Sequence, residues 1–97
     1  MWEKYLITFG EDAAIGLKYN YQTGVLVIGG YAKLLDMMIT FVSGCVHEFV
    51  PSPKFIAANK VRFTFKKTLP QFRQIIKDIP KMDAIATRTN NLERIMR

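Results

Sequence analysis

Cys45 and His47 are the side chains of this sequence best suited to covalent chemistry or metal binding. They stand two positions apart within residues 45–50, which read as a short strand, so both would project from one face. With Asp36 or Glu48 they could form part of a metal site or a Cys–His nucleophile. A zinc site needs about four ligands at recognisable spacing, and no such pattern is present. We therefore interpret the pair as a buried thiol beside an ordinary histidine, and predict no catalytic residue, metal ligand or cofactor.

The basic residues near the end of the chain offer a different chemistry. The net charge is +6, but residues 1–59 contain four Lys/Arg against five Asp/Glu, whereas residues 60–97 contain ten against three. Such asymmetry indicates a negatively charged partner, which can be nucleic acid, an acidic membrane surface or an acidic protein. The residues predicted to contact phosphates lie on one predicted strand and the helix after it: Lys60, Arg62, Lys66, Lys67, Arg73 and Lys77.

Two periodicities place these cations. In residues 60–67 the apolar side chains alternate with Arg62 and Lys66, which share the opposite face of a strand. Arg73 and Lys77 are four apart, so they lie on one face of a helix. Tyr19 and Tyr21 would offer stacking surfaces for bases if they are exposed. The alternative reading is an ordinary solvated surface, because no established nucleic-acid-binding motif is present.

The helix after this strand carries clear signals at both ends. Thr68 stands at an N-cap position, and Gln71 three residues later makes a capping box. Pro70 falls in the first turn, where a missing N–H costs little, and Pro80 ends the helix. The apolar stripe spaced i, i+3, i+4, i+7 consists of Phe72, Ile75, Ile76 and Ile79.

The other elements follow from alternation, helical periodicity and turn residues. Three strands with short turns predict an antiparallel meander, and Gly29-Gly30 is read as the turn that ends the third strand. The next helix has an apolar stripe formed by Leu34, Met37, Met38 and Phe41. The predicted ranges are strands 2–9, 14–21, 25–28, 45–50 and 83–88, a helix over 31–42, the only real loop at 51–59, and a flexible C-terminal segment at 89–97.

These elements predict one small α+β domain spanning residues 1–97. Each helical stripe is apolar on one side only, so we expect a mainly antiparallel sheet of five to six strands with two helices on one face. The two helical stripes are offset by 38 residues, and Val25 and Val27 fall on Phe63 and Phe65 under the same offset. This regularity suggests a duplicated β-α-β unit of the ferredoxin-like kind.

The composition narrows the functional classes. The chain has one cysteine and no signal peptide at its start, which favours a reducing, cytoplasmic location. The apolar stretch 25–46 contains Lys33 and Asp36, which argue against a membrane span.

We predict a small non-enzymatic domain that contacts the phosphate backbone of DNA or RNA. The alternative is a protein-interaction or regulatory module, including a homodimer, without nucleic-acid contact. An enzyme that uses Cys45, His47 or Glu48 is the third reading.

Overall fold

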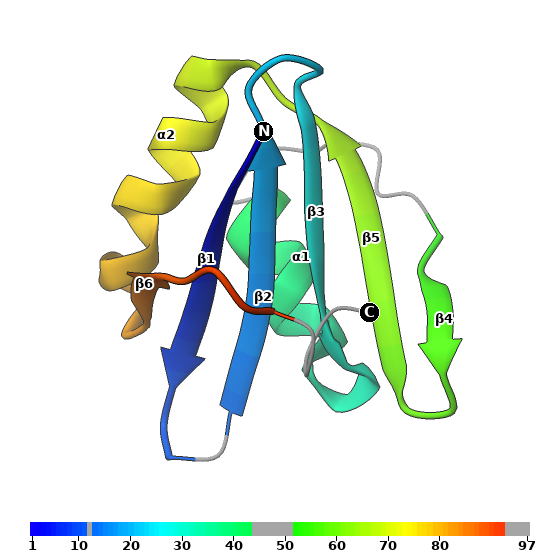
Figure 1. Cartoon of the computed structure of the whole chain (residues 1–97). Coiled ribbons are helices and arrows are strands. Elements are labelled where there is room, and N and C mark those ends of the chain that lie inside the picture. The colour runs from blue at the N-terminus through cyan, green and yellow to red at the C-terminus, as the bar shows by residue number, and fades with distance from the viewer. Residues whose placement is uncertain (12, 44–51, 93–97) are drawn as a thin grey trace.

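The computed structural model describes residues 1–11, 13–43 and 52–92. In this part of the chain two helices, α1 and α2, pack on the same face of one sheet. Figure 1 shows α1 behind the sheet and α2 beside β1. The elements in chain order are β1 (Trp2–Phe9), β2 (Ala13–Asn20), β3 (Val25–Tyr31), η1 (Ala32–Leu34), α1 (Leu35–Ser43), β4 (Lys54–Ala57), β5 (Lys60–Lys66), α2 (Leu69–Asp78), η2 (Ile79–Met82) and β6 (Ile85–Arg88), where η marks a 3-10 helix.

Within the described residues the sheet has six strands in the order β4-β5-β3-β2-β1-β6, and every neighbouring pair is antiparallel. The predicted α+β class, antiparallel sheet and two helices are therefore confirmed. The ferredoxin-like duplication is not confirmed. In the β3-α1-β4 unit one strand separates the two parallel strands, whereas in the β5-α2-β6 unit three strands do. The two units thus do not occupy equivalent positions in the sheet.

The core lies between the sheet and the two helices, a surface that we call the helix face of the sheet. Phe72 of α2 stacks on Tyr19 of β2, with ring centroids 4.3 Å apart and planes inclined by 8°. Such stacked aromatic pairs add to the stabilisation that burial itself provides. The largest buried residues of this core are Ile7, Ile15, Leu17, Tyr19, Leu26, Ile28, Met38, Phe41, Val61, Phe63, Phe72 and Ile79.

The predicted cap of α2 is confirmed. The Thr68 backbone N–H donates to Gln71 Oε1 (2.8 Å), and the Gln71 backbone N–H donates to Thr68 Oγ1 (3.3 Å). Phe72 and Ile75 are buried as the stripe predicts. The helix ends at Asp78, and Pro80 lies in the short 3-10 turn that follows.

The reading of Gly29 and Gly30 as a turn is wrong, because both lie within β3. Gly29 pairs with Gly16 of β2 and Arg62 of β5, and Gly30 continues the same ladders. A Cβ on Gly30 would lie 3.1 Å from Met38 Cε, so the glycine allows α1 to approach the sheet closely. The chain then turns through η1, and α1 starts later than predicted.

The reading of residues 51–59 as a loop is also wrong, because β4 lies within them. Lys54 and Phe55 pair with Arg62 and Val61, which places β4 at the edge of the sheet. β4 is an edge strand at the margin of the core, and most of its residues are exposed. Its sequence therefore lacks the alternation of apolar and polar residues that marks a strand with one buried face. The strand predicted over residues 45–50 lies outside the described residues.

Candidate nucleic-acid interface

The face of the sheet opposite the helices, here called the open face, gathers cations from distant parts of the sequence. Partners on adjacent antiparallel strands project from the same face. Lys4 of β1 pairs with Lys18 of β2, and Arg62 of β5 pairs with Lys54 of β4. Following the register across the sheet gives six cations on this face: Lys4, Lys18, Lys54, Lys60, Arg62 and Lys66.

No acidic side chain of the described strands lies on the open face. Glu3 is the only acid within β1 to β6, and it alternates to the helix face, beside Tyr5 and Phe72. The remaining described acids stand in turns and helices. Positive charge is therefore concentrated on one side of the sheet, in an arrangement suited to an anion with several charges.

Lys18 of β2 lies between Lys4 of β1 and Arg62 of β5 in the order of the strands. Burial lowers its pKa, and the positive charges of Arg62 and Lys4 lower it further. The Lys18 ammonium also lies over the Trp2 ring, with Nζ 4.6 Å from the centroid. A bound anion would offset the repulsion among these three cations.

The open face also has a small apolar area, which the end of the described chain covers in part. Leu92 is buried there against Val27, with Leu6 and Val25 beside it. The Thr89 backbone N–H donates to the Lys4 carbonyl (3.0 Å) and so extends the pairing of β6 with β1. In Figure 1 the chain after β6 passes in front of β1 and β2, opposite the helices. The cations of the open face therefore border an apolar area that Leu92 covers in part.

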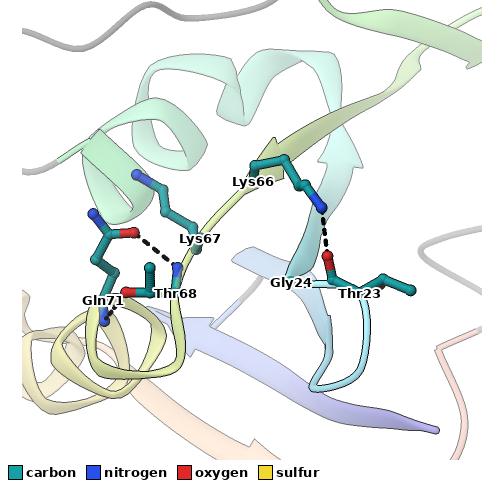
Figure 2. A pocket seen from close by; sticks show the side chains of 6 residues that line it. All are labelled: Thr23, Gly24, Lys66, Lys67, Thr68 and Gln71. Carbon is teal, nitrogen blue, oxygen red and sulfur yellow. Dashed lines mark hydrogen bonds between the residues drawn. The ribbon is translucent and has the colours of Figure 1, made fainter.

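Three of the six sequence-predicted residues lie on the open face. Arg62 is near its centre, while Lys60 is beside Tyr31, with Nζ 5.5 Å from the ring centroid. Lys66 is at the end of β5, where its ammonium donates to the Thr23 carbonyl (2.5 Å) in the β2–β3 turn, as Figure 2 shows. This bond ties β5 to the turn.

Lys67 is not on the open face. It follows β5 on the side of the helices, where it is buried and its ammonium lies 5.8 Å from the centre of the Phe65 ring. Figure 2 shows it in a pocket of about 280 Å³ with Thr23, Gly24, Lys66, Thr68 and Gln71. The backbone N–H groups of Thr68 and Gln71 are already bonded in the capping box, so they are not offered to an anion.

Arg73 and Lys77 are also separated from the open face. Both line a pocket of about 490 Å³ between α2 and the helix face of the sheet, together with Phe72, Ile76, Glu3, Tyr5 and Tyr21. The sequence pattern predicted that all six cations belong to one site. The fold instead places three of them on the open face and three on the side of the helices.

The predicted stacking residues differ in exposure. Tyr19 is buried, and its hydroxyl donates to the Lys67 carbonyl (2.7 Å), so its ring is not available to a base. Tyr21 is 46% exposed and lies on the helix face beside Phe72. Trp2 and Tyr31 are the exposed aromatic residues on the open face.

Sequence reasoning missed Lys4, Lys18 and Lys54 as members of one basic surface. Alternation places each on a face of its own strand, but the relation between strands depends on the sheet order. The charge balance of residues 1–59 also concealed them, because the described acids of that segment, Glu3, Glu11 and Asp36, do not lie on the open face.

The residues of the enzymatic reading, Cys45, His47 and Glu48, lie outside the described residues. Asp36 is exposed on α1. Within residues 1–11, 13–43 and 52–92 no group of three His, Cys, Asp or Glu side chains is arranged to hold a metal ion. Over the same ranges no helix is long and apolar enough to cross a membrane.

Comparison of the whole chain with family models, with curated proteins and with solved structures finds no significant match.

Proposed function

We propose that this protein is a small non-enzymatic nucleic-acid-binding domain that holds the phosphate backbone on the open face. The observation that carries the proposal is the presence of six Lys and Arg side chains on that face, which the sheet order and register bring together from four strands. A chain of phosphodiesters is the biological polyanion that such a surface suits best.

The spacing of the cations favours contact with several phosphates. From β1 to β5 the open face crosses three strand intervals, which at about 4.8 Å each span roughly 14 Å. Lys4, Lys18 and Arg62 occupy successive parts of this span. Each phosphate neutralised would release counterions, so affinity should fall steeply with salt.

Base recognition is expected to be weak. The open face presents Trp2 and Tyr31, and each ring already has a lysine ammonium above it. These rings can stack on any base, because every base has a π face. The charge and the rings together favour binding that depends little on sequence.

The proposal is tested by fluorescence anisotropy with labelled single-stranded DNA, single-stranded RNA and duplex DNA of equal length at low salt. The open-face triple variant Lys4→Gln/Lys18→Gln/Arg62→Gln should bind much more weakly than the wild type. The control Lys33→Gln/Arg73→Gln/Lys77→Gln removes the same charge from the side of the helices and should retain most of the affinity. Absence of binding to all three probes, or equal losses in the two variants, would refute the proposal.

A second candidate function is self-association through the sheet edges. Phe55 of β4 and Ile85 of β6 are 63% and 66% exposed, and these strands are the two edges of the sheet. Exposed apolar edge strands favour pairing with another strand. Sedimentation should then give a dimer that Phe55→Lys or Ile85→Lys dissociates, whereas a strict monomer at high concentration would exclude this function. In a protein-interaction module of the other kind, an acidic protein partner would occupy the open face. Such a partner would compete with the oligonucleotides in the anisotropy assay.

A further inference from the structure

The proposed function does not involve the pocket between α2 and the helix face of the sheet, whose lining combines aromatic and charged side chains. The pocket measures about 490 Å³, within the range of about 300–1,000 Å³ that is usual for small-molecule sites. Aromatic and aliphatic side chains form part of its wall, and charged groups of both signs form the rest. Its lining residues are Glu3, Tyr5, Tyr21, Phe72, Arg73, Ile76 and Lys77.

Glu3 is a buried carboxylate in this wall, with 8% of the residue exposed. The Tyr5 hydroxyl donates to Glu3 Oε1, and Arg88 Nη1 lies 3.3 Å from the same oxygen. Arg88 neutralises the carboxylate and also lies over the Tyr5 ring. Both described contacts converge on Oε1, so Oε2 is left to accept a hydrogen bond from a ligand.

The positively charged side chains of the pocket lie on α2. Arg73 and Lys77 are four residues apart on one helical face, both are exposed, and neither forms an ion pair with a described residue. Tyr21 presents nearly half of its surface beside Phe72. The pocket therefore combines a hydrogen-bond acceptor, an exposed aromatic ring and two cations.

We propose that this pocket binds a guanine mononucleotide. The base would stack on Tyr21 and direct its N1–H and N2–H donors together at Glu3 Oε2, while the phosphate would lie between Arg73 and Lys77. Guanine is favoured because its donors are adjacent on one edge, whereas adenine presents an acceptor beside its amino group. This site is separate from the open face and does not depend on nucleic-acid binding there.

The test uses guanosine, inosine and adenosine 5′-monophosphates with the full-length, isotope-labelled protein, and follows amide shifts during titration. GMP should bind about tenfold more tightly than AMP, a ratio typical of one well-placed hydrogen-bonded pair, and IMP should fall between them because it lacks the 2-amino group. Shifts should centre on the residues of the pocket.

Three variants identify the contacts. Glu3→Gln should remove the preference for GMP over AMP, and circular dichroism shows whether this variant folds. Arg73→Gln and Tyr21→Ser alter exposed side chains and should each weaken both nucleotides about fivefold while leaving the fold intact. Lys33→Gln, a matched loss of one exposed cation from η1, should change neither affinity.

Several results would overturn the proposal. These are no GMP-induced shifts at millimolar concentration, equal affinity for GMP and AMP, or an equal effect of inorganic phosphate alone. Retention of GMP binding by both Arg73→Gln and Tyr21→Ser would do the same. The open-face triple variant separates the two hypotheses, because it should lose oligonucleotide affinity and keep GMP binding.

Discussion

The salt dependence of oligonucleotide binding is the most direct measure of the proposed phosphate contacts. The open face presents six cations in the described strands: Lys4, Lys18, Lys54, Lys60, Arg62 and Lys66. For single strands each neutralised phosphate contributes about 0.7 to the slope of log K against log salt, so six contacts predict a slope of about −4. Between about 50 and 200 mM salt the affinity should then fall roughly 300-fold.

Replacing Lys4, Lys18 and Arg62 with glutamine halves the number of contacts. The slope should change to about −2, and the loss of affinity over the same salt range should shrink to roughly 20-fold. Anisotropy titrations of a labelled single-stranded oligonucleotide at four or more salt concentrations give both slopes.

The control triple variant at Lys33, Arg73 and Lys77 carries the same net charge as the open-face variant. It should keep a slope of about −4, because its substitutions lie away from the open face. A wild-type slope near zero, or an equal slope for the two triple variants, would refute the reasoning, since net charge alone would then explain the binding.

Three further predictions concern stability. Tyr5→Phe removes the hydroxyl that donates to buried Glu3 and should lower the free energy of unfolding by about 1–2 kcal/mol at pH 7. Burial, and after it the bond to Glu3, raises the pKa of Tyr5 from 10.0 to about 12. The difference in free energy of unfolding between the wild type and Tyr5→Phe should therefore be complete below pH 10 and be lost as the pH rises through 12. Urea denaturation curves that give the same difference at pH 7 and pH 11 would contradict this. Thr68→Ala removes one half of the capping box and should cost about 1 kcal/mol by urea denaturation, whereas Thr68→Ser should cost much less; equal losses would exclude the cap as the cause. Leu92→Ala removes side-chain packing against Val27 and should cost about 2 kcal/mol, and an unchanged unfolding midpoint would contradict this.

Local interactions explain most of what could be predicted. The capping box at Thr68 and Gln71 closes over four residues, and the stripe of α2 repeats within two turns, so both are visible in a short stretch of sequence. The meander follows in the same way from alternation and from turns such as Gly24, whose φ of 73° suits glycine. These features depend on neighbours along the chain.

The errors arise where contacts distant in sequence decide the structure. Gly29 and Gly30 look like a strand end, but β2 and β5 hold them in two ladders, and Met38 of α1 approaches Gly30 closely. Likewise β4 is a strand because β5 supplies its hydrogen-bond partners. Tyr19 was a possible stacking surface by its type, yet the packing of α2 buries it.

The sequence by itself determined the α+β class, the amphipathic elements and the excess of positive charge after residue 59. Only the tertiary structure decided where that charge lies. Sheet order and register bring Lys4 and Lys18 beside Arg62, and the position of α2 carries Arg73 and Lys77 to the other side of the sheet. The physical reason is that alternation places a side chain on one face of its own strand, whereas the set of side chains that share a surface depends on pairing between strands far apart in the chain.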